Sequence, residues 1–111
     1  MPTLFLDPGQ FSHWLLIEEP EDVGDGQGGF TREWREIAAT WGMIVPLSAR
    51  MREVARQTDE RTTHHITVRW RADIRSGLRF RKGERLFRIR TAYDPDETGR
   101  FLLCRCEEEG R

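Results

Sequence analysis

"THHITVRWRADI", residues 62–73, alternates apolar and polar side chains through its middle. Because successive side chains of an extended chain point to opposite faces, this alternation predicts a half-buried β-strand. Its apolar face holds Ile66, Val68 and Trp70. Its polar face holds Thr67, Arg69 and Arg71. Three uses of the arginine face stay open at this point: solvated surface, a grip on nucleic acid, or contact with other protein subunits.

The charged residues are unevenly distributed along the chain. The 111 residues carry a formal net charge of −1, and 33% of them are charged, which predicts one soluble domain with a modest core. Residues 61–90 hold ten basic and two acidic side chains, whereas the rest holds eight basic and seventeen acidic ones. This polarity suits docking against a charged surface, including another copy of the chain. The alternative is that the charges simply coat the solvent-exposed faces.

The N-terminus and the cysteines indicate a protein of cytoplasmic origin. The N-terminal residues lack a basic leader, and their apolar run is too short for a signal peptide. No stretch approaches the length of a membrane span, so we expect no membrane partner. The two cysteines, Cys104 and Cys106, are fewer than a secreted scaffold of this size usually carries.

The first 47 residues predict an arm, a strand, a loop and further strands. Residues 1–11 mix chain breakers with apolar side chains, which predicts an arm that docks on a neighbour or covers the end of its own barrel. Residues 12–20 predict a strand closed by Pro20, and residues 21–29 predict a flexible loop. Residues 30–47 predict one long or two shorter strands. The side chains expected to be buried there are Phe30, Trp34, Trp41, Met43 and Val45.

The hydrophobic period changes in residues 47–61. Leu47, Met51, Val54 and Ala55 recur at helical spacing, and Ser48 is a suitable N-cap. The pattern therefore predicts a short helical or irregular insert. Because its apolar stripe is thin, we expect the insert to owe its shape to a partner.

The second half of the chain predicts antiparallel strands joined by tight turns. Residues 78–93 alternate on both sides of Lys82-Gly83, which indicates a β-hairpin. The side chains expected to point inward are Leu78, Phe80, Phe87 and Ile89, and those expected to point outward are Arg79, Arg81, Arg88 and Arg90. Turns at 76–77 and 94–99 and a last strand at 100–108 complete the pattern. It predicts a single mainly β domain over residues 1–111, with a small antiparallel barrel or sandwich as its core at 12–108.

The chain offers no set of residues suited to catalysis or to metal binding. Cys104 and Cys106 share one side of a strand, but no second Cys or His pair stands at zinc-site spacing. His64 and His65 are adjacent and so face opposite sides. The carboxylates stand in loop and tail runs, and no nucleophile elbow or phosphate-binding glycine loop appears. We expect no enzyme activity, no catalytic residue, no metal and no cofactor.

A small β-barrel with an arginine-rich face can also bind nucleic acid. Single-strand binding favours exposed aromatic side chains between the arginines. Trp70, Phe80 and Phe87 fall on the apolar sides of their strands, and we expect them in the core. A single-stranded nucleic-acid-binding module is therefore the alternative function rather than the preferred one.

Taken in order, these pieces resemble the head–tail joining proteins of long-tailed bacteriophages, also called head-closure or stopper proteins. "GQFSHWLLIEEP" (9–20) resembles the opening strand of that family, which ends in a proline. "WGMIVPLSAR" (41–50) resembles the run W-x-x-I-x-P-L-S followed by a small residue and Arg. Residues 62–73 resemble the central strand, and residues 77–108 resemble the closing hairpin, the Asp-rich turn and the last strand. Ser12-His13 and the apolar N-terminal arm depart from the family pattern.

The resemblance implies a structural component of a virus-like particle, assembled in the bacterial cytoplasm. Members of the family form a ring below the portal and its adaptor, close the channel after DNA packaging, and carry the tail. The implied partners are six or twelve copies of the chain, adaptor or portal proteins, tail terminator or tail tube proteins, and packaged double-stranded DNA. Adaptors are mostly helical, so this strand-rich chain fits a stopper better. The particle is that of a phage, a prophage or a gene transfer agent.

A polarised subunit in a ring can set basic strands against the acidic surface of its neighbour. The candidate interface residues are Arg69, Arg71, Arg88 and Arg90 on the basic side and Glu18, Glu19, Asp22 and Asp25 on the acidic side. By the resemblance, residues 47–61 line or plug the channel. The candidate lumenal residues are Leu47, Arg50, Met51, Arg52 and Arg56. Their contacts with DNA would be phosphate contacts, independent of sequence.

Overall fold

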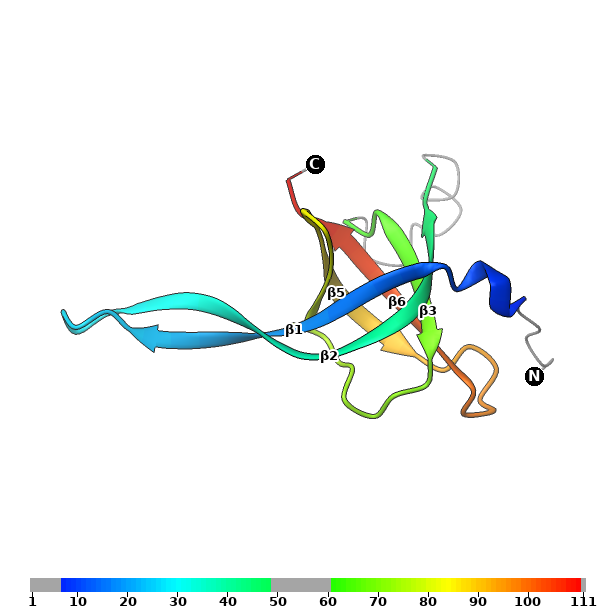
Figure 1. Ribbon diagram of the computed structural model, residues 1–111, viewed down its shortest axis with the longest axis horizontal. Coiled ribbons are helices and arrows are strands. Elements are labelled where there is room, and N and C mark those ends of the chain that lie inside the picture. Colours follow the sequence, from blue (N-terminus) through cyan, green and yellow to red (C-terminus); the bar gives the residue numbers. More distant parts are fainter. Residues whose placement is uncertain (1–6, 49–60, 111) are drawn as a thin grey trace.

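The computed structural model of the chain describes residues 7–48 and 61–110, which form one closed antiparallel barrel (Figure 1). The elements are η1 (Pro8–Gln10), β1 (His13–Gly24), β2 (Phe30–Pro46), β3 (His64–Arg69), β4 (Arg79–Lys82), β5 (Arg85–Tyr93) and β6 (Phe101–Glu108). The strand order around the barrel is β1-β2-β3-β6-β5-β4. The expected mainly β architecture is confirmed, and the sheet closes on itself.

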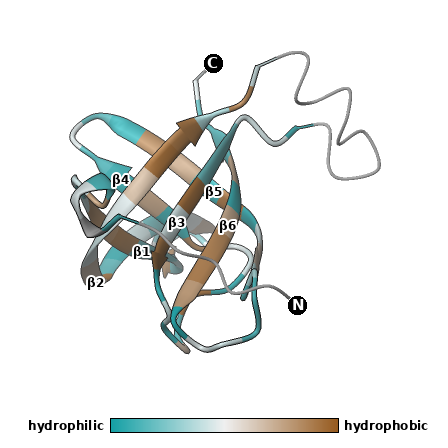
Figure 2. Cartoon of the chain, turned by 90° about the vertical axis from the view of Figure 1, so that its right-hand side faces the viewer, coloured by the Kyte–Doolittle hydropathy of each residue, from teal (hydrophilic) through white to brown (hydrophobic). Residues whose placement is uncertain are grey.

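The barrel interior is a single apolar core. Every strand contributes side chains to it, and those of β2 are only partly buried. Figure 2 shows brown, apolar stretches along the barrel strands and paler or teal residues at many of the connections. The fully buried members include Leu15, Ile17, Ile66, Val68, Leu78, Phe80, Phe87, Cys104 and Cys106. The inward positions expected for the 78–93 hairpin and for Ile66 and Val68 are therefore confirmed.

Trp70 departs from the expected alternation, because its side chain is 48% exposed. Strand β3 ends at Arg69, and the backbone N–H of Trp70 donates a hydrogen bond to the carbonyl of Arg100 in the connection before β6. The period of two holds only where the chain stays extended and paired on the barrel. The indole therefore lies outside the core.

The burial expected for β2 is wrong at its aromatic residues. Phe30 is 76% exposed and Trp41 is 52% exposed, while Trp34, Met43 and Val45 are only partly covered. The side chains of β2 that pack against the core are Ile37, Ala38 and Ile44. Gly42 pairs with Val68 and Ile44 pairs with Ile66, so the register turns the opposite set of residues inward.

Pro20 does not close the first strand, which continues to Gly24. β1 pairs with β4 only at Leu16, Ile17 and Glu18, so beyond Glu18 it has β2 as its sole strand neighbour among the described residues. An open edge of this kind tolerates a proline, since no ladder hydrogen bond is lost on that side. The expected loop at 21–29 shrinks to the turn between Gly24 and Phe30.

The two strands beyond the barrel form a projecting ribbon, residues 19–36, which we call the hairpin arm (Figure 1). It gives the molecule a longest dimension of 54 Å against 29 and 24 Å in the other directions. At its end, the Asp25 carboxylate accepts hydrogen bonds from the backbone N–H groups of Gln27 (2.7 Å) and Gly29 (3.1 Å). A two-stranded ribbon is only marginally stable by itself, so the hairpin arm depends on its attachment to the barrel.

The expected turns after the insert are confirmed. Gly77 has φ of 95° and Gly83 has φ of 60°, left-handed conformations that glycine adopts without a steric cost. In the 94–99 turn, the Asp94 carboxylate accepts hydrogen bonds from the N–H groups of Glu97 (2.9 Å) and Gly99 (2.7 Å). The helix expected within 47–61 falls largely on residues 49–60, and most of the N-terminal arm falls on residues 1–6. Both lie outside the described residues.

Gly42 occupies a position where no larger side chain fits. A Cβ atom there would lie 2.7 Å from Leu15 Cδ1 and 3.1 Å from Val68 Cγ1, both buried in the core. We expect Gly42→Ala to lower the free energy of unfolding by about 1–3 kcal/mol because the core must shift to admit the methyl group.

Urea denaturation followed by tryptophan fluorescence measures this change. Gly24→Ala is the matched control, since a Cβ at Gly24 meets nothing within 4 Å. The control is expected to stay within about 0.5 kcal/mol of the parent chain. Equal effects of the two substitutions would contradict the close packing of β2 on β1 and β3.

Candidate functional site

A buried ion pair fixes the hairpin arm where it leaves the barrel. Glu18 of β1 is 6% exposed and Arg79 of β4 is 7% exposed. The Arg79 Nε–H donates to Glu18 Oε1 at 2.6 Å, and the Arg81 Nε–H donates to Glu18 Oε2 at 3.0 Å. Both oxygens of this carboxylate are therefore engaged within the chain. The register shift between Ile17 and Glu18 in the β1–β2 pairing lies at the same point.

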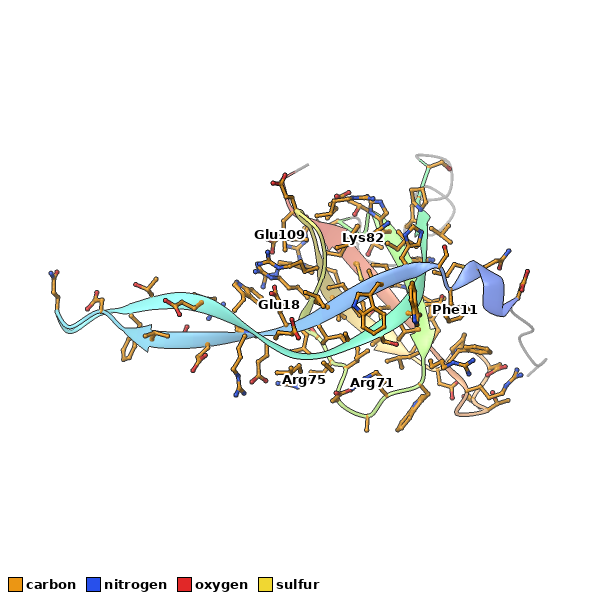
Figure 3. The ribbon with its side chains drawn as sticks, viewed as in Figure 1. Phe11, Glu18, Arg71, Arg75, Lys82 and Glu109 are labelled. Carbon is orange, nitrogen blue, oxygen red and sulfur yellow. The ribbon has the colours of Figure 1, made fainter. Side chains whose placement is uncertain are left out.

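Trp34 of the hairpin arm extends this attachment. The Arg79 guanidinium lies 4.0 Å from the centroid of the Trp34 ring, and the Arg88 guanidinium lies 6.0 Å from it. Both arginines also face Glu109, at 3.8 Å from Arg79 and 3.6 Å from Arg88. Figure 3 shows Glu18 and Glu109 near the base of the arm. Arg79 points away from the barrel core, as expected, but its side chain is buried because the hairpin arm covers it.

Several of the expected interface residues have partners in their own chain. The Arg71 guanidinium holds Asp73 in two hydrogen bonds of 3.0 and 2.9 Å, and this cation lowers the pKa of the Asp73 carboxyl. Arg90 lies 3.6 Å from Glu107. Glu19 is paired with Arg35 and lies 3.7 Å from Arg75. Many of the basic side chains on the surface therefore form ion pairs with acidic side chains of the same chain.

The acidic residues farther out on the hairpin arm are more accessible. Asp22 lies 3.3 Å from Arg32, and both side chains are more than half exposed. Asp25 is exposed in the terminal turn. The expected acidic set is thus divided: Glu18 is buried at the base, Glu19 is partly covered, and Asp22 and Asp25 lie near the end of the arm.

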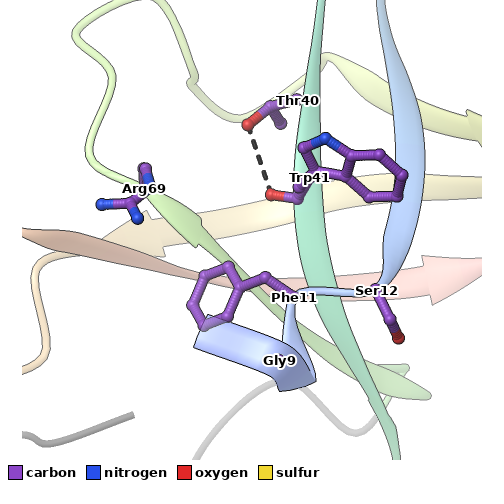
Figure 4. A pocket seen from close by; sticks show the side chains of 6 residues that line it. All are labelled: Gly9, Phe11, Ser12, Thr40, Trp41 and Arg69. Carbon is purple, nitrogen blue, oxygen red and sulfur yellow. Dashed lines mark hydrogen bonds between the residues drawn. The ribbon is translucent and has the colours of Figure 1, made fainter. Parts of the chain in front are cut away.

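Arg69 lines an open pocket at the other end of β1 and β2. The pocket has a volume of about 490 Å³. Its lining residues are Gly9, Phe11, Ser12, Thr40, Trp41 and Arg69, and we call it the aromatic pocket (Figure 4). Within the described residues, no hydrogen bond or ion pair holds the Arg69 guanidinium.

Two aromatic rings line this pocket, Phe11 and Trp41, and each packs on a further ring. Trp14 and Trp41 are directly opposite on β1 and β2, with ring centroids 5.1 Å apart, and about half of each side chain is exposed. Phe11 packs on Phe101 with centroids 5.6 Å apart. Sequence reasoning missed the pocket because it assigned Trp41 to the core. The alternation of Trp14 against the buried Leu15 and Ile17 was the available signal.

The two cysteines are buried in the core, and the two histidines of β3 lie on opposite faces of that strand. Burial raises the pKa of the Cys104 thiol to about 12 and also raises the pKa of Cys106, so both thiols stay protonated near neutral pH. The His64 ring packs edge-on against the Phe87 ring, with centroids 5.1 Å apart. Its neighbour His65 lies on the opposite face of β3, directly across from Arg105 of β6. Residues 7–48 and 61–110 contain no group of three or more His, Cys, Asp or Glu placed to hold a metal ion.

The candidate lumenal residues are mostly beyond the described part of the chain. Arg50, Met51, Arg52 and Arg56 lie outside it. Leu47 is described, and its backbone N–H donates to the carbonyl of Thr63 at 2.9 Å. This bond joins the two ends of the insert beside β2 and β3. No helix within the described ranges is long and apolar enough to cross a membrane.

Comparison with known proteins gives one family and two informative structures. Residues 6–109 match the model of the phage head completion protein family. A chain in the virion of a native gene transfer agent particle is 30% identical, with a TM-score of 0.64 over 87% of this chain and 94% of that one. A solution structure of a protein from Shigella flexneri 2a is 19% identical, with a TM-score of 0.74 over 96% and 99% of the two chains, and shows the shared fold. No curated protein sequence matches significantly.

The buried pair at the base of the arm predicts a large effect of removing one partner. Arg79→Ala leaves the Glu18 carboxylate in a covered site with its shortest hydrogen bond lost. We expect the free energy of unfolding to fall by about 3 kcal/mol, because a buried carboxylate that loses one of its two guanidinium partners is costly.

Urea denaturation of Arg79→Ala beside Arg32→Ala provides the measurement. Arg32 pairs with Asp22 in an exposed ion pair, and its removal is expected to cost less than about 1 kcal/mol. If Arg79→Ala were as mild as Arg32→Ala, the Glu18–Arg79 pair would not anchor the arm.

Proposed function

The chain belongs to the phage head completion protein family, and from that premise we propose that it forms the head-closure, or stopper, ring of its particle. It is a structural head–tail component of a phage or gene transfer agent virion. In the proposed role, the ring joins the portal and adaptor of the DNA-filled head to the tail and helps to retain the DNA.

The match to a virion chain over nearly its whole length is the observation that carries this proposal. That chain is part of a gene transfer agent particle, and 94% of it is covered at 30% identity. The aligned region covers 87% of this chain. A projecting two-stranded ribbon is only marginally stable by itself, so contacts with another subunit would support it.

The proposed partners follow from a position between head and tail. Six or twelve copies would match the symmetry of a portal, with adaptor or portal proteins above and tail terminator or tail tube proteins below. Residues 47–61 would approach the packaged double-stranded DNA through Arg50, Arg52 and Arg56. Contacts of this kind reach phosphates, so they are independent of sequence and weaken with salt.

The ion pairs within the chain narrow the surface available to a neighbouring copy. Arg71 holds Asp73, and Arg88 faces Glu109. Of the expected basic residues, Arg69 is therefore the best placed for a contact with another subunit. Asp22 and Asp25 are the best placed acidic residues, because they lie near the end of the arm.

Single-stranded nucleic-acid binding is a second candidate function, favoured by one observation. Trp70 follows Arg69 in the sequence, Trp41 lines the same pocket as Arg69, and both tryptophans are exposed. Phe80 and Phe87 are buried, as expected. Exposed aromatic rings beside a cation can stack on bases. This arrangement is equally suited to a protein partner with apolar and acidic side chains.

Deletion of the gene tests the head-closure role. We expect electron microscopy of the deletion strain to show DNA-leaking heads without tails beside free tails, because a filled head needs closure before a tail can attach. Supplying the gene in trans is the control and should restore tailed particles. Normal tailed particles from the deletion strain would contradict the role and favour the nucleic-acid-binding alternative.

A further inference from the structure

The arm tip, residues 22–31, presents apolar side chains that its own barrel does not cover. Phe30 is 76% exposed and Val23 is 37% exposed. Phe30 is the first residue of β2 and pairs with Gly24, the last residue of β1. Only these two strands support it. An exposed phenylalanine at the end of a projecting ribbon is typical of a side chain that enters a partner's pocket.

The aromatic pocket lies at the far end of the same two strands. His13 pairs with Gly42 beside the pocket, whereas Gly24 pairs with Phe30 at the arm tip. β1 contains 12 residues. At about 3.3 Å per residue, the two ends are separated by roughly 36 Å. The arm tip cannot fold back into the pocket of its own chain, so an arm tip that occupies the pocket belongs to another copy.

The charges of the two surfaces are complementary. Arg69 at the pocket has no hydrogen-bond or ion-pair partner in the part of the chain that the structure describes. The arm tip carries Asp22 and Asp25, and Asp22 faces Arg32, the residue that follows the tip on β2. Asp25 uses Oδ1 for the two backbone bonds of the turn, so its second oxygen can accept from a guanidinium.

We propose that the arm tip of one copy docks in the aromatic pocket of the next copy. Phe30 packs against Phe11 and Trp41, and Asp25 faces Arg69. Each copy then gives one tip and receives one, which makes the contact heterologous, and heterologous contacts close into rings when the rotation allows it. The inference rests on the proposed stopper ring and names the contact that builds it.

Disulfide trapping in assembled particles tests this contact. Gly24→Cys with Ser12→Cys places one thiol directly opposite Phe30 at the arm tip and one at the pocket, too far apart to join within a chain. A Cβ at Gly24 meets nothing within 4 Å, so Phe30 is left in place. Cys104 and Cys106 are buried, so they do not compete. Mild oxidation is expected to give a ladder of dimers, trimers and larger species on a non-reducing denaturing gel. Gly24→Cys with Thr91→Cys, whose second thiol lies on exposed β5 surface outside the pocket, should give no ladder.

The other occupants of the pocket give different results. If the N-terminal residues 1–6 of the same chain filled it, Phe5→Cys with Ser12→Cys would cross-link within the monomer and the tip variant would give no ladder. If single-stranded nucleic acid filled it, an oligothymidine would quench the tryptophan fluorescence of the purified chain in a salt-dependent way. Either result without a ladder would overturn the proposal.

A second variant keeps the test decisive if the cysteine chain does not assemble. Phe30→Ser is expected to lower the yield of tailed particles about tenfold or more, as truncation of an anchoring aromatic side chain does. Its urea midpoint should match that of the parent chain, because Phe30 makes no core contact. Tyr93→Ser removes another exposed aromatic side chain and should assemble normally. Parental yield from Phe30→Ser would overturn the proposal.

The stopper role and the tip contact can fail separately. If purified tailed particles lack this chain altogether, the stopper role fails. If the chain is present in tailed particles and the double cysteine variant gives no ladder, the role stands and the contact alone is wrong.

Discussion

The contact between Glu18 and Arg79 is the constraint on which the shape of the molecule depends. It lies where β1 leaves β4, and its 2.6 Å hydrogen bond is covered from solvent. Because a buried charge is stable only beside its partner, the pair fixes the register of β1 and β4 at the base of the hairpin arm. Trp34, stacked under Arg79, adds an apolar surface that only this arm direction provides. The pair thereby turns a marginal ribbon into a directed extension of the barrel.

Many basic side chains of the middle of the chain form ion pairs with acidic side chains of its C-terminal end. The acidic end of β6 and the residue after it face the basic strand β5 through the pairs Arg85–Glu108, Arg88–Glu109 and Arg90–Glu107. These ion pairs join β5 to β6 across the barrel wall, and most of them are partly exposed and individually weak. What remains for partners is concentrated at the two ends of the β1–β2 ribbon. The barrel holds these ends apart, and the arm carries one of them outward.

The sequence predicts the closing hairpin well because its signals are local. Alternation around Lys82-Gly83 places Phe80 and Phe87 inward, as the structure confirms. The same reasoning fails for Phe30, Trp34 and Trp41, because the residue type alone does not distinguish an exposed aromatic side chain from one in the core. The burial of Glu18 could not be predicted from the sequence either, because it depends on the β1–β4 register rather than on neighbours in sequence. Of the residues expected at a subunit interface, Asp22 and Asp25 are exposed on the arm, whereas Arg71, Arg88 and Arg90 face acidic side chains of their own chain.

The most direct test of the account is a cryo-electron microscopy structure of the neck of the intact particle. The account predicts a closed ring of this chain between the portal or adaptor and the tail. In that ring, every barrel has the hairpin arm held at the angle set by Glu18 and Arg79. Density for the chain elsewhere in the particle, or a neck built without it, would contradict the head-closure role.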